Sequence, residues 1–489
     1  MAVNIEPVKP VPFLCSLALG LLIWFVVPVP EGVSPNAWHL LALFVATIAA
    51  IISKALPIGA VSVIAISLVA LTQVTQPGNP KAALADALSG FSNELIWLIG
   101  ISIMISHSLN KTGLGARIGY FMIALFGKRT LGIAYALAFS ETVLAPVTPS
   151  NTARGGGIIH PIMRSIASSF GSSPEQGTNH KIGRYLALVN YNTNPITSAM
   201  FITATAPNPL IVSLIYEGSG RQLSWTMWAV AAFVPALASL LVMPLLIYLM
   251  YPPEIKRTPD APGFAREQLA GLGPLSIAEK VTLAVFGLLL FLWAGVPAMI
   301  WGDAYAVSPT TAALVGLSVL LLSGVLKWDE ILGNKGAWDT IMWFSALVMM
   351  AGFLGKLGLV QWLADTVGSR IDGLGLSWVM GMLILVLVYV YSHYFFASTT
   401  AHITAMFAAF FTAGIALGAP PMLLALTLGF SSSLMMSLTH YGTGTAPIIF
   451  GSAYVTLGEW WKVGFVVSVV NLIIWFYLGG FWWKLLGYW

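Results

Sequence analysis

Charged side chains and cysteine are both scarce in this sequence of 489 residues. Lys, Arg, Asp and Glu together make up 8% of the chain, whereas soluble domains carry about 25%. Because a water-facing surface cannot be built from so few charges, the composition excludes a cytosolic enzyme, a nucleic-acid-binding protein and a disordered chain. The single cysteine, Cys15, excludes an intrachain disulfide and a cysteine-rich metal site.

Long apolar stretches take the place of the missing charges. Hydrophobic residues make up 58% of the chain, with 18 Trp and 25 Phe among them. Only helices and closed barrels satisfy every backbone group inside a bilayer. We therefore predict an all-α polytopic membrane protein with about 11 transmembrane helices and two re-entrant hairpins. The candidate spans are residues 11–30, 38–53, 56–75, 94–110, 131–147, 185–217, 226–251, 281–300, 308–326, 338–355, 375–397, 403–417, 420–440 and 463–485.

The first apolar span, residues 11–30, is too long for the core of a signal peptide and is followed by no small-residue cleavage site. We expect it to be retained as the first transmembrane helix. No transit peptide is evident, so the expected location is the inner (plasma) membrane of a bacterium, with the N-terminus in the cytoplasm. The net charge of +4 then reflects orientation in a lipid membrane and not nucleic-acid binding.

Basic residues flank the apolar segment 131–147 on both sides. Lys128 and Arg129 precede it, and Arg164 and Lys181 follow it. Because basic loops stay in the cytoplasm, the segment at about 131–168 is expected to enter and leave the membrane on that side. Its middle, residues 145–152, holds two prolines and four hydrogen-bonding side chains. Such a stretch is typical of the irregular tip of a re-entrant helical hairpin buried in protein.

Three landmarks recur in the same order in both halves of the chain. Segments 97–114, 149–154 and 203–207 parallel segments 343–359, 397–402 and 443–447. We predict two halves, residues 1–252 and 281–489, joined by a polar cytoplasmic linker loop at 253–280. The second half holds a hairpin at about 375–417 that lacks basic flanks, so an odd number of crossings between the halves would invert it. Inverted repeats with broken helices are a common plan of secondary transporters.

Polar residues open the second arm of each predicted hairpin. The first tip carries Ser150-Asn151-Thr152 and the second carries Ser398-Thr399-Thr400. These residue types cap helix N-termini, and a helix N-terminus favours anions. Two such termini meeting inside the membrane would bind a dianion, with one carboxylate at each hairpin. The alternative is that these residues only cap helices, but polar caps inside an apolar stretch favour the binding site.

A Thr-x-Thr-Ala-Pro sequence breaks one apolar segment in each half. Pro cannot donate the helical i→i−4 hydrogen bond, so both segments are expected to be broken helices whose threonines present hydroxyls to a ligand. A proline kink satisfied locally by threonine is an equally good interpretation. The residues concerned are Thr203, Thr205 and Pro207 in the first half and Thr443, Thr445 and Pro447 in the second.

Two cationic side chains stand at equivalent positions of the hairpins. Arg154 and His402 each lie four residues after the first serine of their motif. An ionisable residue at membrane depth is a functional hypothesis by default, and we favour a pair of cations beside the anion site. The alternatives are an arginine that snorkels to the cytoplasm and a neutral core histidine bonded to a carbonyl. Glu141 is expected to be a structural partner.

The Ser-Asn-Thr motif at two opposed hairpin tips resembles the mark of the divalent anion/sodium symporter family, over nearly the whole chain up to Trp489. Segment 144–154 is similar to bacterial citrate/succinate and tartrate/succinate exchangers, and plastid 2-oxoglutarate/malate translocators are expected to be more distant. The resemblance implies a homodimer. It also implies that a transport domain holding the hairpins moves against a scaffold domain as an elevator.

The chain departs from the sodium-coupled members of that family. Those relatives bind sodium with the motif Ser and Asn and with a polar residue four positions earlier; here the earlier positions hold Pro146 and Tyr394, and the second Asn is Thr399. We expect Arg154 and His402 to supply fixed positive charge instead. Because fixed cations cannot leave, an empty carrier would expose charge to hydrocarbon. This predicts sodium-independent, obligatory exchange of dicarboxylates or tricarboxylates, with no cofactor, no bound metal and no enzymatic activity.

Three other functions stay open at this point. The nearest is a sodium-coupled dicarboxylate symporter with a rearranged cage of Asn151, Thr399 and backbone carbonyls. An intramembrane enzyme is less favoured, because the sequence has no nucleophile motif and no zinc-ligand spacing. An anion channel is also less favoured, because two occluding hairpins have no purpose in it. Succinate, malate, fumarate, tartrate, 2-oxoglutarate and citrate all suit the predicted site.

Overall fold

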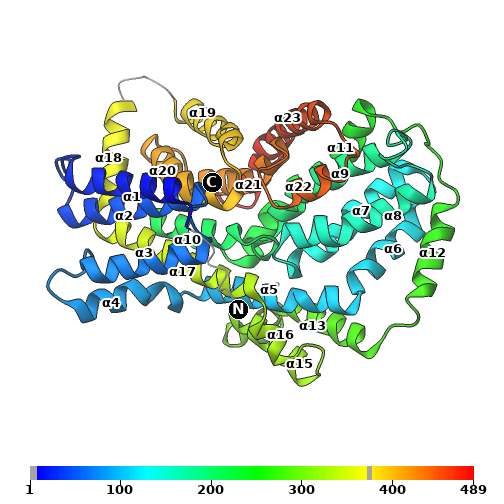
Figure 1. Ribbon diagram of the computed structural model, residues 1–489, viewed down its shortest axis with the longest axis horizontal. Helices are drawn as coiled ribbons and strands as arrows, with labels where there is room; N and C mark the ends of the chain where they lie inside the picture. The colour runs from blue at the N-terminus through cyan, green and yellow to red at the C-terminus, as the bar shows by residue number, and fades with distance from the viewer. Residues whose placement is uncertain (1–7, 372–376) are drawn as a thin grey trace.

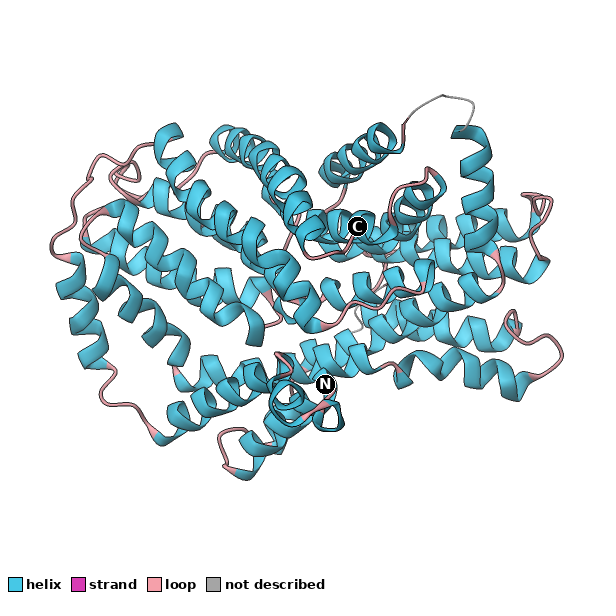
Figure 2. Ribbon diagram, turned by 180° about the vertical axis from the view of Figure 1, so that it is seen from behind, coloured by secondary structure: helices cyan, strands magenta, loops and turns pink. Residues whose placement is uncertain are grey.

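The computed structural model describes residues 8–371 and 377–489, which form a bundle of helices (Figure 1). Within these residues no β-strand forms, and the only extended pairing is an isolated bridge between Arg129 and Arg257 (Figure 2). Eight helices of the described part are long and apolar enough to cross a membrane. The predicted all-α polytopic membrane fold is confirmed, and the count of about 11 crossings stays a prediction.

The polar linker separates two sets of helices. The first half contains α1 (Pro10–Phe25), α2 (Pro35–Ile52), α3 (Ile58–Thr72), α4 (Pro80–Leu88), α5 (Glu94–Thr112), α6 (Leu114–Phe126), α7 (Thr130–Leu144), α8 (His160–Ser169), α9 (Gly183–Met200), α10 (Pro207–Ser219) and α11 (Trp225–Met250). The second contains α13 (Ile277–Trp293), α14 (Val296–Trp301), α15 (Pro309–Leu322), α16 (Trp328–Leu332), α17 (Lys335–Lys356), α18 (Leu359–Ile371), α19 (Trp378–Tyr391), α20 (Thr399–Ala416), α21 (Pro421–Leu434), α22 (Thr445–Phe450), α23 (Leu457–Ile473) and α24 (Gly480–Leu485).

Serine followed by proline starts two of these helices. Ser34 accepts a hydrogen bond from the backbone N–H of Ala37 at the start of α2, and Ser308 accepts one from Thr311 at the start of α15. In both helices proline occupies the first position, where its missing N–H removes nothing. These local signals fix the N-termini of the two helices.

The linker between the halves shows that the first hairpin is re-entrant. Its extended part hydrogen-bonds to both flanks of the hairpin: Thr258 N donates to the Lys128 carbonyl (3.0 Å), and Ile255 N donates to the Lys181 carbonyl (3.1 Å). Since one short segment reaches both flanks, the chain between them enters and leaves at the same end of the bundle. The linker was expected to be a loop throughout; instead its middle forms the helix α12 (Ala261–Gly271).

Both hairpins have an irregular tip between two helical arms. In the first, α7 ends in a 3-10 turn (Ala145–Val147), and the second arm starts as a π-helical stretch (Thr152–Ile159) that continues into α8. In the second, α19 ends in a 3-10 turn (Ser392–Phe395), and α20 is a regular helix. The predicted boundary of about 131–168 agrees with the first pair of elements to within one residue at each end, and 375–417 encloses the second pair. Residues 375 and 376 lie outside the described part.

Each half also contains the expected broken helix. The single apolar span predicted at 185–217 is divided into α9 and α10 by a short irregular segment, and α21 and α22 are divided in the same way. α9 and α22 lie side by side near the centre of the molecule (Figure 1). The two breaks therefore come together although about half of the chain separates them in sequence.

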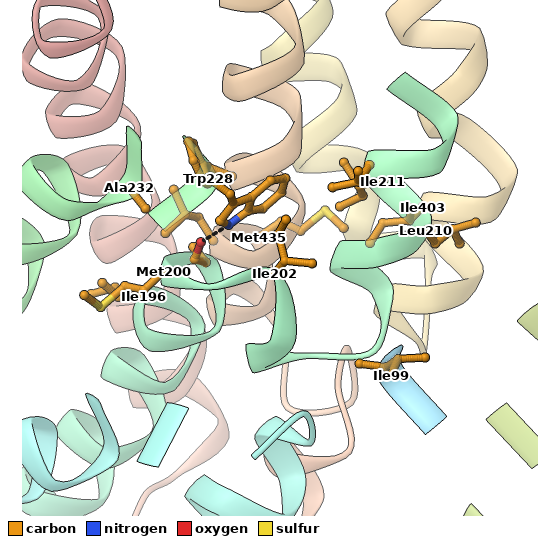
Figure 3. Close-up of a cluster of buried hydrophobic side chains, with 14 of the residues drawn as sticks. Ile99, Ile196, Met200, Ile202, Leu210, Ile211, Trp228, Ala232, Ile403 and Met435 are labelled. Atoms are coloured by element: carbon orange, nitrogen blue, oxygen red, sulfur yellow. Dashed lines mark hydrogen bonds between the residues drawn. The ribbon is translucent and has the colours of Figure 1, made fainter. Parts of the chain in front are cut away.

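The exposed backbone of the first break is satisfied by side chains. Asn208 donates its amide N–H groups to the carbonyls of Ser198 (2.8 Å) and Phe201 (2.9 Å). Trp228 of α11 donates its indole N–H to the Ala199 carbonyl (2.8 Å), amid buried Ile and Met side chains (Figure 3). Because unpaired carbonyls are costly inside an apolar core, these contacts allow α9 to end in the interior of the protein.

Candidate functional site

The two hairpin tips and the two helix breaks meet at one cavity of about 350 Å³. This volume lies at the lower end of the range for small-molecule sites. Two helices outside the hairpins, α5 and α17, complete the wall. The cavity is lined by Ile103, Pro149, Ser150, Asn151, Thr152, Thr205, Ala206, Pro207, Gly336, Thr340, Ala397, Ser398, Thr399, Thr400, Met436, Thr443 and Gly444, none of which is charged.

The first serine of each motif caps the helical arm that follows it. Ser150 Oγ accepts from the backbone N–H of Ala153 (3.1 Å), and Ser398 Oγ accepts from that of Ala401 (3.4 Å). The other N–H groups of these first turns have no acceptor within the helix, and each N-terminus carries about half a positive charge. Two polarised helix ends therefore border an otherwise uncharged, hydroxyl-lined cavity.

The middle residue of each motif fastens its tip to a helix break. The amide of Asn151 donates to Thr443 Oγ1 (2.8 Å) and lies within hydrogen-bond distance of Asn194 Oδ1 (3.3 Å). Thr399 Oγ1 donates to the carbonyl of Gly442 (3.1 Å). The bond from Asn151 crosses between the halves, because Thr443 belongs to the second repeat. The side chains at the centre of both motifs are thus already hydrogen-bonded.

Arg154 lies beside the cavity wall and does not line it. Its side chain is fully buried, and one guanidinium nitrogen donates to the carbonyls of Thr148 (2.6 Å) at the hairpin tip and Ala204 (2.7 Å) at the helix break. Its other nitrogens contact Ser198 Oγ (3.0 Å) and a carboxylate oxygen of Glu141 (3.3 Å). The snorkelling alternative is wrong, because this guanidinium is at 0% exposure.

Glu141 provides the negative charge opposite Arg154. It is also fully buried, and its Oε1 accepts hydrogen bonds from the Asn194 amide and from Thr197 Oγ1 (3.0 Å). Its Oε2 is buried without a hydrogen-bond partner among the described residues, so the pairing of this carboxylate rests on Oε1 alone. The sequence-based expectation of an uncompensated charge at position 154 is therefore corrected, since the structure pairs this charge with a carboxylate.

His402 occupies the equivalent place in the second hairpin but has different surroundings. It is fully buried and lies off the cavity lining. Its Nδ1 lies 3.0 Å from Nδ1 of His393, and its Nε2 lies 3.4 Å from Ser392 Oγ. The ring stacks on Phe396, with 4.5 Å between centroids, and packs against Tyr389. No carboxylate contacts it among the described residues.

The two Thr-x-Thr-Ala-Pro sequences contribute different residues to the cavity. Thr205, Ala206 and Pro207 line it from the first half, and Thr443 and Gly444 line it from the second. Thr445 is buried away from the cavity, and Pro447 is exposed elsewhere. Thr203 is also buried; it donates to the Pro146 carbonyl and accepts from the Trp225 indole.

The polar residues of α9 and the α17 residues that line the cavity were not predicted as site residues from the sequence. Asn194, Thr197 and Ser198 hold the Arg154–Glu141 pair, and Gly336 and Thr340 of α17 line the cavity. A signal for the first group exists in the sequence, because residues 190–194 place three asparagines before a proline inside an apolar span. No comparable signal marks the α17 residues.

The comparisons with known proteins identify the family. The Sodium:sulfate symporter transmembrane region family matches residues 8–489. The chain belongs to the divalent anion/sodium symporter family. A Bacillus subtilis (strain 168) protein named "Putative malate transporter YflS" is 52% identical over 99% of this chain and 98% of its own length. Members of the family are transporters, in agreement with the prediction that the chain is not an enzyme.

Plant members of this symporter family are also similar. The chloroplastic dicarboxylate transporter 1 of Arabidopsis thaliana is 48% identical over 98% of this chain and 83% of its own length. The plastid transporters were expected to be more distant relatives than bacterial exchangers, and this one is 48% identical to the chain, against 52% for the bacterial protein above. Among solved structures, the YdaH transporter of Alcanivorax borkumensis matches 87% of this chain and 98% of its own, with a TM-score of 0.58 and 13% identity, which shows a shared fold.

Two positions that differ from the sodium-coupled symporters can now be located. Pro146 precedes the first tip, and its carbonyl is taken by Thr203. The backbone carbonyl of Tyr394, before the second tip, accepts a hydrogen bond from the Tyr441 hydroxyl (2.7 Å). Both carbonyls have partners within the protein. Among the described residues, no group of three or more His, Cys, Asp or Glu side chains is arranged to hold a metal ion.

Proposed function

We propose that this chain exchanges one dicarboxylate for another across the inner membrane, without sodium, by an elevator movement within a homodimer. The observation that carries the proposal is the position of Arg154, whose guanidinium joins carbonyls of the first hairpin tip and the first helix break. Oxygen atoms of this kind bind small cations in proteins. A covalently attached cation in that position cannot be released.

The features of the cavity and the names of the relatives support a dicarboxylate as the substrate. Two capped helix N-termini border the cavity, and each can receive one carboxylate through backbone N–H groups and hydroxyls. The relatives named above are described as transporters of malate and of dicarboxylates. A volume of about 350 Å³ suits a four-carbon or five-carbon dicarboxylate, and citrate has less room. Ser150, Thr152, Ser398 and Thr400 are the proposed contacts, with Thr205 and Thr443.

With one proton on the His393–His402 pair, charge counting would favour movement of the loaded carrier over the empty one. The Arg154–Glu141 pair is neutral overall, while two helix ends together contribute about one positive charge. Without an anion, these helix ends would be carried through the membrane uncompensated, and with a dianion the site has about one negative charge left. One proton on the His393–His402 pair would balance it. His402 therefore keeps its proposed role as a cation when it is protonated.

The wall of the cavity supports an elevator. Hairpin and helix-break residues form one side, while Ile103 of α5 and Gly336 and Thr340 of α17 form the other. Small and apolar side chains on the second side allow the first to slide without breaking charged contacts. We propose that α5 and α17 belong to the scaffold domain, and that the hairpins move with the broken helices.

The alternative function is sodium-coupled symport. One observation favours it: His393 Nε2 and Thr439 Oγ1 are buried near the second tip without a hydrogen-bond partner among the described residues. Against it, the proposed cage residues Asn151 and Thr399 already bond to Thr443 and Gly442. Sodium binding at the first tip would also require Arg154 to vacate its carbonyl contacts.

Counterflow in proteoliposomes tests the proposal. Uptake of labelled malate should require internal dicarboxylate and should be unchanged when choline replaces sodium on both sides. Uptake into empty vesicles, or a steep rise with external sodium, would show symport instead. A panel of succinate, fumarate, 2-oxoglutarate, tartrate and citrate inside the vesicles would rank the counter-substrates, and single-channel recording should show no conductance.

A further inference from the structure

A second, larger cavity of about 760 Å³ adjoins the proposed substrate site. Its walls are the start of α1, the turn between α2 and α3, and the tip of the second hairpin. Ala397 and Ser398 line both cavities. The second hairpin tip is therefore the shared wall, and a molecule in the larger cavity lies next to the cap of the α20 helix.

Two lysines border this cavity. Lys9 and Lys54 are both exposed and both line it, and no acidic residue does. Neither lysine forms an ion pair with any of the residues that the structure describes. The backbone N–H of Lys9 donates to the Ala55 carbonyl (3.2 Å), which holds the start of α1 against the α2–α3 turn. The two positive charges thus lie beside the same cavity.

Lys54 adopts a backbone conformation that glycine would adopt more readily. Lys54 follows the last turn of α2 in the left-handed conformation, with φ of 51°. Glycine adopts this conformation freely, whereas other residues are disfavoured by about 1 kcal/mol. Helices very commonly end on glycine at such a position. Glycine at this position would therefore be accepted without strain in the turn.

We infer that this cavity is an entry vestibule in which Lys9 and Lys54 attract the carboxylates of the substrate before it reaches the hairpin tips. The inference rests on the proposed function, because it assumes that an anion is the cargo. Clefts lined by one sign of charge raise the local concentration of an oppositely charged ligand, and the effect falls with ionic strength. A dianion feels each lysine twice as strongly as a monoanion does.

Lys54→Gly is the most informative variant. Glycine fits a φ of 51° without strain, so the change removes the charge without weakening the fold. In vesicles of neutral phosphatidylcholine at low ionic strength, the KM for malate exchange should rise roughly three- to tenfold, with kcat unchanged. Lys9→Gln should act in the same direction, and Lys54→Arg should restore the wild-type KM.

The controls separate this effect from others. Lys81→Gln removes another exposed lysine, at the start of α4 and away from both cavities, and should leave KM unchanged. At high salt the Lys54→Gly and wild-type KM values should converge. An unchanged KM in Lys54→Gly and in the Lys9→Gln/Lys54→Gly double variant at low salt would overturn the inference, while wild-type counterflow would still support the proposed function.

Anionic lipid headgroups carry the same charge as the substrate and are the other ligand for these lysines. If the variants change transport only in vesicles that contain phosphatidylglycerol, and not in pure phosphatidylcholine, the lysines bind lipid and the vestibule assignment is wrong. A loss of wild-type exchange itself would overturn the proposed function first. The three results are therefore distinguishable from one another.

Discussion

Both hairpins hold a buried basic residue beside a serine-capped helix start, but different side chains contact that residue in each. Both place a serine cap at the start of the second arm, and both place a basic residue one turn later, with a backbone hydrogen bond of 3.0 Å back to the serine carbonyl. At the first tip that residue is Arg154, paired with Glu141. At the second it is His402, stacked between aromatic rings and bonded to a second histidine.

The two tips share a backbone arrangement but differ in the side chains that hold the basic residue. The backbone of the tip, its cap and the direction of the arm recur in both halves. The means of holding a basic residue inside the membrane does not recur, because an ion pair needs a carboxylate on α7, and α19 has none within the described residues. We expect folding and exchange to depend on the Arg154–Glu141 charge balance at the first tip. We expect exchange to depend on protonation of the His393–His402 pair at the second tip.

The largest effect should come from breaking the charge balance at the first tip. Arg154→Met leaves the carboxylate of Glu141 fully buried and unpaired, which costs about 3–5 kcal/mol. We expect little folded protein, seen as a lowered melting temperature and an aggregated peak in size-exclusion chromatography. The Arg154→Met/Glu141→Gln double variant should recover most of the folded protein but not exchange.

That double variant is needed because Arg154→Met alone cannot separate folding from transport. A single Arg154→Met variant as stable as the wild type would contradict the pairing with Glu141. Restored counterflow in the double variant would contradict the proposed role of the fixed cation at the first tip.

The exchange rate should depend on pH through the second tip and not through the first. His402→Phe keeps an aromatic ring between Phe396 and Tyr389 but leaves Nδ1 of the buried His393 without its partner, so the melting temperature should fall by an amount that corresponds to about 1–3 kcal/mol. We expect exchange to fall at least tenfold, by an order-of-magnitude estimate for losing a buried charge that balances the substrate. Wild-type exchange should decrease as pH rises, since the cationic form of the His393–His402 pair is required.

His107→Gln provides the control for this experiment, because His107 is exposed on α5 and far in sequence from both tips. Its exchange rate should keep the pH profile of the wild type. A His402→Phe variant with the same rate and the same decrease at high pH would show that another group controls the profile.

These contrasts also show how far the sequence predicts the site. The tips and the breaks follow from prolines and polar residues in apolar segments, and both appear in the fold, whereas the inversion of the second half stays a prediction. The partner of Arg154 was weakly indicated, because Glu141 is 13 residues away and a helical arm had to be folded back to pair them. Gly336 and Thr340 carried no signal, since a small residue that lines a cavity resembles one that packs a helix.

Removing the serine caps should raise the KM for malate by the same factor at the two tips. This effect should be smaller than those of the changes at Arg154 and His402. Ser150→Ala and Ser398→Ala each lose one cap hydrogen bond, worth about 1 kcal/mol, and one hydroxyl beside the substrate. The KM for malate should rise about fivefold in each variant, with counterflow still measurable. If only one of the two variants changes KM, the substrate contacts that tip alone, and the proposal of one carboxylate per hairpin is wrong.

The smallest effects should come from two threonines that the sequence repeat makes equivalent and the structure does not. Thr205 lines the cavity, whereas Thr445 is fully buried and its hydroxyl has no hydrogen-bond partner among the described residues. Valine keeps the shape of threonine and removes only the hydroxyl. Thr205→Val should raise the KM about threefold to fivefold, while Thr445→Val should leave the KM unchanged and the melting temperature equal or slightly higher, because it removes an unpaired buried polar group. Equal KM increases in both variants would mean that the two breaks face the substrate symmetrically in another state of the transport cycle, and that the asymmetry belongs to this conformation alone.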